Sequence, residues 1–270
     1  MNRAEKQWRK FVAIGDSFTE GLSDRGLGDS YYGWADRLAQ SLSDSYCSKS
    51  QPLQYANLAV RGRLVTQMVE EQVPRAIELK PDLVSFAGGV NDAMRASFDL
   101  DARATDLERG VRSLRQAGID VLLVAFGDAS TSSGIMKMTA HRFSGLNSAT
   151  VALAEAYDCY LMNFWGMEEF IDESVWDEDR LHLNPLGHRM AADTALAALG
   201  IEPPKLPRSS PVKRIGGSGS LGRIGRTAGH LRWIKNHGAP WVGRRIRGVS
   251  SGDGINPKYW DYTSVVPQSR

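Results

Sequence analysis

Short apolar runs alternate along the first 200 residues with longer segments in which apolar residues recur at helical spacing. This alternation is expected of a parallel sheet that is covered by helices on both faces. The predicted strands run from about Lys10 to Ile14, Leu53 to Leu58, Leu83 to Ala87, Val121 to Ala125 and Tyr160 to Phe164. The predicted helices run from about Trp34 to Leu42, Thr66 to Glu78, Asp106 to Gln116, Ser144 to Tyr157 and Pro185 to Leu199. The pattern therefore predicts an α/β sandwich of five strand-helix units.

Residues at the ends of these segments support the predicted boundaries. Gly118 suits a helix C-terminus, where a left-handed backbone is needed. Asn184 suits an N-cap, and Pro185 suits the first helical turn, where the missing N–H costs nothing. Pro74 lies inside the predicted second helix, which should be kinked or broken there.

The composition changes after residue 204, where proline, serine and glycine become frequent, as in a flexible linker. We therefore predict a folded domain over residues 1–204, followed by a linker and basic extension over residues 205–270. From residue 201 onward there are 13 Lys or Arg and 3 Asp or Glu, a balance of +10, within a chain whose overall net charge is only +2. Residues 1–200 therefore carry a balance of −8.

The basic extension leaves three interpretations open: it docks on its own acidic domain or on a second subunit, it is a solvated tail, or it binds an anionic ligand. Its arginines are scattered and no recognised nucleic-acid motif accompanies them, which argues against a nucleic-acid partner.

The spacing of the cysteines and the length of the apolar runs indicate where in the cell the protein is expected. Cys47 and Cys159 lack the spacing of a disulfide framework or a zinc site, and no metal site is predicted. The apolar run Phe11 to Ile14 is too short for a signal peptide or a membrane span. We therefore expect a cytoplasmic protein.

Candidate chemistry gathers where the first three predicted strands end. The first strand leads into Gly15-Asp16-Ser17, the second into a loop that contains Gly62, and the third into Gly88-Gly89-Val90-Asn91-Asp92. In an open α/β sheet, ligands bind at the carboxyl edge of the strands. The sequence thus predicts a serine with glycine and amide neighbours at the ligand-binding edge.

A carboxylate and a histidine complete this set near the end of the predicted domain. Serine needs a neighbouring base to become a nucleophile, and that base needs a partner that fixes its tautomer. His182 and Asp179, which lies three residues earlier, suit these two roles. The backbone N–H groups of Ser17 and Gly62 and the side-chain amide of Asn91 are candidate donors to a tetrahedral oxyanion.

These blocks, Gly15-Asp16-Ser17, Gly62, Gly89-Val90-Asn91-Asp92 and Asp179 to His182, resemble in order those of the GDSL/SGNH hydrolase family. The resemblance covers about residues 10–200, although Phe18 replaces the leucine of the GDSL signature. It implies a flavodoxin-like sandwich with a five-stranded parallel sheet in the order 2-1-3-4-5. It also implies hydrolysis of a small-molecule carboxylic ester through an acyl-enzyme, with no cofactor, by Ser17, His182 and Asp179.

Other interpretations remain open at this stage. A different class of function is a non-catalytic module of the same fold whose basic tail engages an anionic partner. Asp16 and Asp92 are expected to brace their loops rather than to act on substrate, and His188 to face away from the site. The segments 24–32 and 127–143 are either pocket walls or ordinary surface structure.

Overall fold

The computed structural model describes residues 6–26, 30–131, 135–203 and 251–268. The predicted linker that follows residue 204 lies outside the described residues. In the described part of the chain, no helix combines the length and the hydropathy needed to cross a bilayer.

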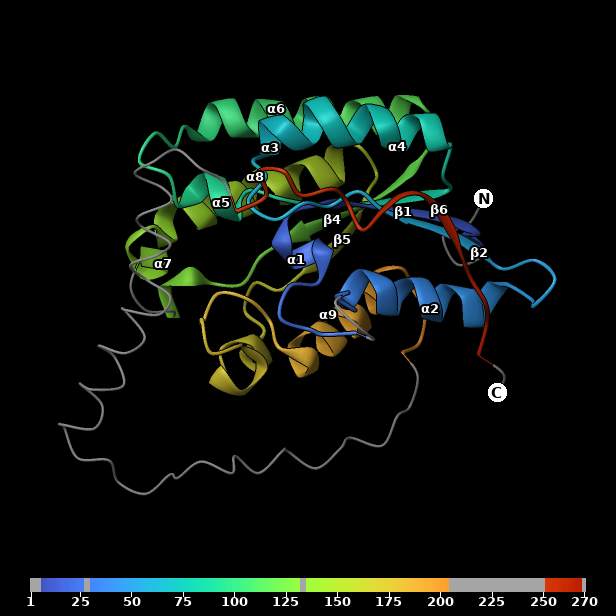
Figure 1. Ribbon diagram of the computed structural model, residues 1–270. Helices are drawn as coiled ribbons and strands as arrows, with labels where there is room; N and C mark the ends of the chain where they lie inside the picture. The colour runs from blue at the N-terminus through green and yellow to red at the C-terminus, as the bar shows by residue number, and fades with distance from the viewer. Residues whose placement is uncertain (1–5, 27–29, 132–134, 204–250, 269–270) are drawn as a thin grey trace, which may run out of the picture.

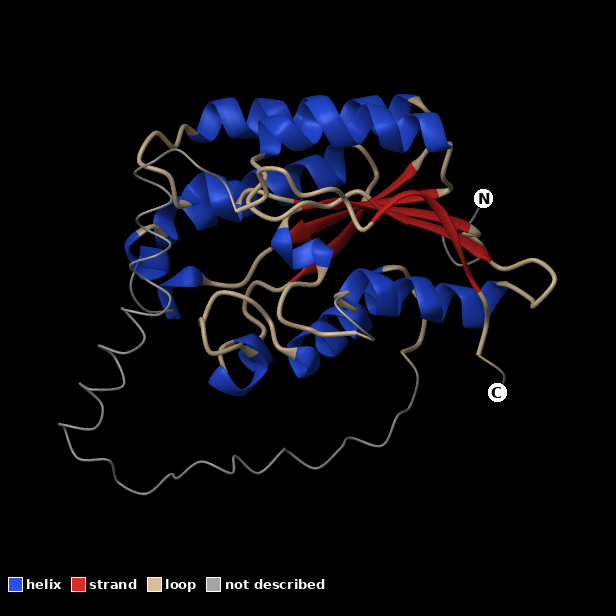
Figure 2. Cartoon of the chain, in the orientation of Figure 1, coloured by secondary structure: helices blue, strands red, loops and turns tan. Residues whose placement is uncertain are grey.

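A six-stranded sheet forms the centre of the molecule, and helices cover both of its faces (Figures 1 and 2). The strand order is β5-β4-β3-β1-β2-β6, in which β1 to β5 are parallel and β6 is antiparallel to β2. The strands are β1 (Lys10–Gly15), β2 (Leu53–Asn57), β3 (Leu83–Ala87), β4 (Asp120–Ala125), β5 (Tyr160–Asn163) and β6 (Tyr259–Val265). The α/β class and the order 2-1-3-4-5 are therefore confirmed, whereas the predicted strand count of five is wrong.

The sixth strand comes from residues that sequence analysis assigned to the extension. Its sequence, Tyr-Trp-Asp-Tyr-Thr-Ser-Val, is rich in the aromatic and β-branched residues that favour strands. Leu53 pairs with Val265 and Asn57 with Tyr259, with a register shift between Tyr55 and Asn57. The chain therefore returns to the sheet about 200 residues after the strand with which it pairs.

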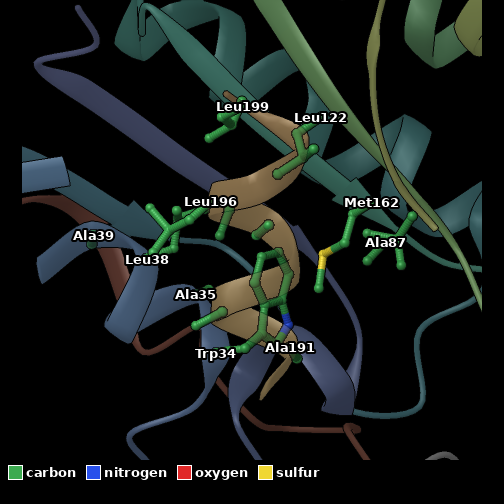
Figure 3. Packing of buried hydrophobic residues seen from close by; sticks show 14 of the residues in the cluster. Trp34, Ala35, Leu38, Ala39, Ala87, Leu122, Met162, Ala191, Leu196 and Leu199 are labelled. Atoms are coloured by element: carbon green, nitrogen blue, oxygen red, sulfur yellow. The ribbon is translucent and has the colours of Figure 1, made fainter. Parts of the chain in front are cut away.

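One face of the sheet is covered by α2 (Trp34–Tyr46) and α9 (Pro185–Ala198), as Figure 1 shows. Buried side chains of these helices pack against β1, β4 and β5, and Figure 3 shows Trp34, Leu38 and Leu196 among them. The predicted caps are present, because the Asn184 side chain accepts hydrogen bonds from two N–H groups of the first turn of α9.

The other face is covered by helical segments that share a second apolar core. They are α3 (Val65–Gln67), the π-helical turn η2 (Met68–Gln72), α4 (Val73–Leu79), α6 (Leu100–Gln116) and α8 (Ala140–Ala156). The predicted helix from Thr66 to Glu78 is thus divided, and Pro74 lies in the first turn of α4, where its missing N–H is tolerated. Gly118 has a φ of +77° just after α6, as predicted.

Short helical segments occupy the loops at the carboxyl edge of the sheet. They are α1 (Ser17–Glu20), α5 (Val90–Ala93), α7 (Ile135–Met138) and the 3-10 turns η3 (Ala129–Thr131), η4 (Glu168–Phe170) and η5 (Glu173–Val175). These segments follow β1, β3, β4 and β5, so they place several polar and aromatic residues around one edge of the sheet.

Candidate active site

Ser17, His182 and Asp179 form a continuous chain of hydrogen bonds at the carboxyl edge of β1. The Ser17 hydroxyl lies 3.0 Å from Nε2 of His182, and Nδ1 of the same ring lies 2.5 Å from Oδ2 of Asp179. All three side chains are partly buried. The three residues that sequence analysis selected as nucleophile, base and acid are therefore brought together, although the serine and the histidine lie 165 positions apart in the sequence.

A closed turn holds Asp179 against His182. Trp176 and Leu183 form an antiparallel bridge across this turn, and the N–H of Asp177 donates to the carbonyl oxygen of His182. Oδ1 of Asp179 accepts the N–H groups of Leu181 and His182, which leaves Oδ2 directed at the imidazole. Burial raises the pKa of Asp179, but the bonds and charge of His182 and the two N–H donors outweigh it and lower the pKa overall.

The turn that carries Ser17 is fixed by close packing around Gly15. A Cβ at Gly15 would lie 2.6 Å from the Thr19 hydroxyl and 2.7 Å from the carbonyl oxygen of Ala87, so only glycine fits there. The buried side chain of Gln72 binds both the N–H and the carbonyl oxygen of Gly15, at 2.8 and 3.0 Å. The backbone entering the Ser17 turn is therefore held on two sides.

Asn91 joins the loops that follow β1, β2 and β3. Its amide nitrogen lies 2.9 Å from Oδ2 of Asp16 and 3.3 Å from the carbonyl oxygen of Arg63. The other carboxylate oxygen of Asp16 accepts the N–H of Phe18 at 3.1 Å. The geometry thus fits the bracing role expected of Asp16.

Burial of Asp16 raises the pKa of its carboxyl group to about 6, while the Phe18 N–H, the charge of His182 and the Asn91 amide act in the opposite direction. Asp92 is also buried, accepts the N–H of Val65 and lies near Arg103. Its contacts likewise fit the bracing role expected for it.

The loop after β2 holds Gly62, whose φ of +75° lies in the region that favours glycine. The preceding residue, Arg61, donates its N–H to Glu20 at 2.8 Å and forms an ion pair with the same carboxylate. Glu20 is buried at the end of α1, the short helix that begins with Ser17. One carboxylate therefore ties the Gly62 loop to the turn that carries Ser17.

An apolar pocket of about 170 Å³ opens beside Ser17 and His182. Gly127, Asp128, Ala129 and Phe143 line it, so part of the segment 127–143 is a pocket wall. Most of the aromatic wall instead follows β5, a contribution that sequence analysis missed; these residues are Phe164, Trp165, Phe170 and Trp176. The apolar run after Tyr160 was the signal that could have indicated this wall.

The other segment proposed as a wall, residues 24–32, contributes no lining residue among those the structure describes. Trp34, which follows it, is fully buried and stacks on Phe18 with ring centroids 5.3 Å apart. This aromatic residue therefore packs helix α2 onto the turn that carries Ser17.

His188 lies closer to the site than its place in the sequence indicated, because it lines the pocket and stacks on Phe18. The expectation that it faces away was wrong. Helix α9 begins at Pro185, shortly after His182, and His188 lies on the buried side of its first turns. Nδ1 of His188 accepts the Trp34 N–H at 3.3 Å, and Nε2 lies 3.1 Å from the Leu22 carbonyl oxygen. A neutral ring satisfies both contacts, and burial lowers its pKa to about 4.

This pKa gives a testable dependence of stability on pH. Between pH 6.5 and 4 the unfolded chain protonates His188 while the folded protein does not, so stability falls as the pH falls. The loss should reach on the order of 3 kcal/mol. Urea unfolding at pH 7 and at pH 4.5 should show that His188→Gln lacks most of this loss, whereas parallel curves for the two proteins would contradict it.

A family model for the GDSL-like lipase/acylhydrolase family matches residues 13–190 of the chain. The search of curated proteins found no match to the chain. Among solved structures, a variant of Axe2, an acetyl xylan esterase from Geobacillus stearothermophilus, superposes with a TM-score of 0.61 at 18% identity, covering 73% of this chain and 97% of its own.

Two further solved structures share the fold at similarly low identity. LAE5, an α/β hydrolase from the metagenome of Lake Arreo, Spain, gives a TM-score of 0.59 at 22% identity, covering 72% of this chain and 96% of its own. The psychrotrophic esterase EstA from Pseudoalteromonas sp. gives a TM-score of 0.56 at 18% identity, covering 71% of this chain and 97% of its own. The similar fold and the match of the family model agree, and the chain belongs to the GDSL-like lipase/acylhydrolase family of ester hydrolases.

Proposed function

We propose that the protein hydrolyses carboxylic esters through an acyl-enzyme formed on Ser17. The observation that supports this most directly is the hydrogen-bond chain from the Ser17 hydroxyl through His182 to Asp179, beside an apolar pocket. A serine with this partner has both the base that removes its proton and the carboxylate that orients the base.

The reaction follows from these positions. The Ser17 oxygen attacks the ester carbonyl carbon while Nε2 of His182 takes the hydroxyl proton. The tetrahedral intermediate collapses, the carbon–oxygen bond to the leaving alcohol breaks, and His182 returns the proton to that alcohol. Water then attacks the acyl-enzyme and gives a proton to His182. When the bond between the acyl carbon and the Ser17 oxygen breaks, His182 returns that proton to the serine, and the carboxylic acid leaves. Asp179 holds Nδ1–H of His182 and stabilises its transient positive charge.

The oxyanion of each tetrahedral intermediate needs donors that are already in place. We assign this role to the backbone N–H groups of Ser17 and Gly62 and to the side-chain amide of Asn91. The amide of Asn91 donates to Asp16 and, at the longer distance of 3.3 Å, to the Arg63 carbonyl oxygen. The oxyanion would replace Arg63 as acceptor, while the bond to Asp16 keeps the amide oriented.

The pocket beside Ser17 favours an apolar acyl group. Its lining is mainly aromatic and aliphatic, and its volume of about 170 Å³ is close to that of an apolar cavity of about 150 Å³ that accommodates benzene. An acyl chain of roughly six carbons should therefore fit. Each methylene that enters such a site contributes about 0.8 kcal/mol, or roughly fourfold in kcat/KM.

Hydrolysis of p-nitrophenyl esters from acetyl to dodecanoyl tests both the reaction and the pocket. We expect kcat/KM to rise to about the hexanoyl ester and then to level off or fall. Met94→Trp, which fills the pocket, should remove this rise while acetyl ester hydrolysis persists. Met138→Trp is the matched control, because Met138 is 78% exposed. A profile that Met94→Trp leaves unchanged would contradict acyl binding in this pocket.

The comparisons do not support the other class of function, a non-catalytic binding module. The family model describes acylhydrolases, and the three structures reported above are described as esterases or as a hydrolase.

A further inference from the structure

The C-terminal segment of residues 251–265, here named the C-terminal strap, runs from the Gly62 loop to the edge of the sheet. Gly252 is buried against this loop: a Cβ there would lie 2.1 Å from the carbonyl oxygen of Arg61 and 2.9 Å from Cγ1 of Val60. This approach is so close that only glycine fits. The strap therefore touches the backbone immediately before Gly62.

The atom in contact belongs to the peptide unit that supplies the proposed oxyanion donor. The carbonyl oxygen of Arg61 and the N–H of Gly62 are parts of one planar, trans peptide group and point in opposite directions. A surface that holds this oxygen therefore fixes the direction of the Gly62 N–H. Glu20 holds the other side of the loop by accepting the N–H of Arg61.

Lys258 anchors the strap between Gly252 and β6. Its ammonium group donates to Oδ2 of Asp36 at 2.7 Å and to the carbonyl oxygen of Tyr31 at 2.9 Å. The side chains of Lys258 and Asp36 are only 10% and 5% exposed, and the same carboxylate oxygen accepts the N–H of Gly33. A buried pair of this kind holds its partners in one geometry, because separating them would leave a charge buried and unpaired.

Strand β6 anchors the far end of the strap. It extends the sheet beside β2, the strand that leads into the Gly62 loop. The Ser43 hydroxyl donates to the carbonyl oxygen of Val265 at 2.6 Å, and Arg75 pairs with Asp261 and lies over the Trp260 ring. The strap is thus fixed on the C-terminal side of its contact with the loop, since Gly252 is followed by Lys258 and then by β6.

We infer that the C-terminal strap positions the Arg61–Gly62 peptide for oxyanion binding, with Gly252 as the contacting residue. This inference rests on the proposed function, in which the Gly62 N–H is an oxyanion donor. The strap touches neither Ser17 nor the acyl pocket among the described contacts, so it acts on the rate of the chemical step and not on substrate binding.

Gly252→Ala in the full-length chain tests the inference. The added methyl group must displace the Arg61 carbonyl oxygen or the strap, so kcat should fall about tenfold or more, up to the roughly hundredfold loss of one oxyanion donor. KM should change less than twofold. Gly254→Ala is the matched control, because the same methyl group meets nothing within 4 Å there and strains only its own backbone at φ +77°. It should lower Tm and leave kcat nearly unchanged.

A second variant loosens the strap without a steric clash. Lys258→Met combined with Asp36→Asn removes both charges of the buried pair, and it should lower kcat several-fold with KM nearly constant. Unchanged kcat in this double variant and in folded Gly252→Ala protein would overturn the inference, whatever happens to Tm. If Ser17→Ala hydrolysed esters as well as the native protein, the proposed function itself would fail. Loss of activity in Ser17→Ala with unchanged strap variants would refute the strap alone.

Discussion

Replacing Ser17 by alanine should lower kcat for p-nitrophenyl ester hydrolysis by about four to six orders of magnitude. Among the described hydrogen bonds, the Ser17 hydroxyl is the only partner of Nε2 of His182, at 3.0 Å. No other oxygen in these bonds is therefore placed to form the acyl-enzyme. KM should change little, because the pocket proposed to bind the acyl group is left intact. Stopped-flow kinetics would also show that the burst of p-nitrophenol from acylation is lost.

Ser130→Ala is a matched control for this change. Ser130 follows the pocket wall at Asp128 and Ala129, and its hydroxyl donates to Asp128 and not to a histidine. It should keep native kcat. Equal losses in the two variants would mean that the serines affect activity through folding, and an active Ser17→Ala protein would remove Ser17 as nucleophile.

Asp179→Asn should lower kcat by about 10⁴-fold while the protein remains folded. Oδ1 of the asparagine can still accept the N–H groups of Leu181 and His182, but its NH₂ group would then face Nδ1 of His182. That ring would place its proton on Nε2, which would then donate to Ser17 instead of accepting its proton. Histidine ¹⁵N chemical shifts at neutral pH should therefore show the reversed tautomer.

Glu178→Gln removes the neighbouring exposed carboxylate and should leave both kcat and the tautomer unchanged. Retention of native kcat in Asp179→Asn would show that the carboxylate serves only to close the turn between Trp176 and Leu183.

The parallel part of the fold could be predicted because its signals are local. Each buried strand is a short apolar run, and the caps at Gly118 and Asn184 depend on neighbouring residues alone. Resemblance to a family supplied the strand order, which the alternation of strands and helices does not determine. Likewise, Asp179 and His182 could be paired from spacing because both lie in one short turn.

What sequence analysis missed depends on contacts between distant residues. Strand β6 pairs with β2 about 200 residues away, and its composition alone does not show which sheet edge it joins. The close approach of Gly252 to Arg61 also joins distant residues, and neither residue shows in its own segment that it will contact the other. The aromatic residues after β5 are visible in the sequence as an apolar run, but their place in the pocket wall depends on where that loop lies relative to Ser17.

The partners of Asn91 show the same limit at atomic scale. Its place after β3 predicted a donor at the active edge, but the hydrogen bonds of its amide to Asp16 and Arg63 arise only when three strand-end loops meet. The raised pKa of Asp16 has the same origin, because burial is a property of the assembled site.

Covalent trapping of the nucleophile tests the proposed reaction most directly. An ethyl phosphonofluoridate would lose fluoride to the attacking serine oxygen and remain bound as a stable ester, which intact-protein mass spectrometry detects. We expect one phosphonyl group per chain, located on Ser17 by peptide mapping, with loss of ester hydrolysis in proportion to labelling and no adduct in Ser17→Ala. Ester hydrolysis that continues in fully labelled protein, or an adduct on another residue that accounts for the loss of activity, would contradict the assignment of Ser17 as nucleophile.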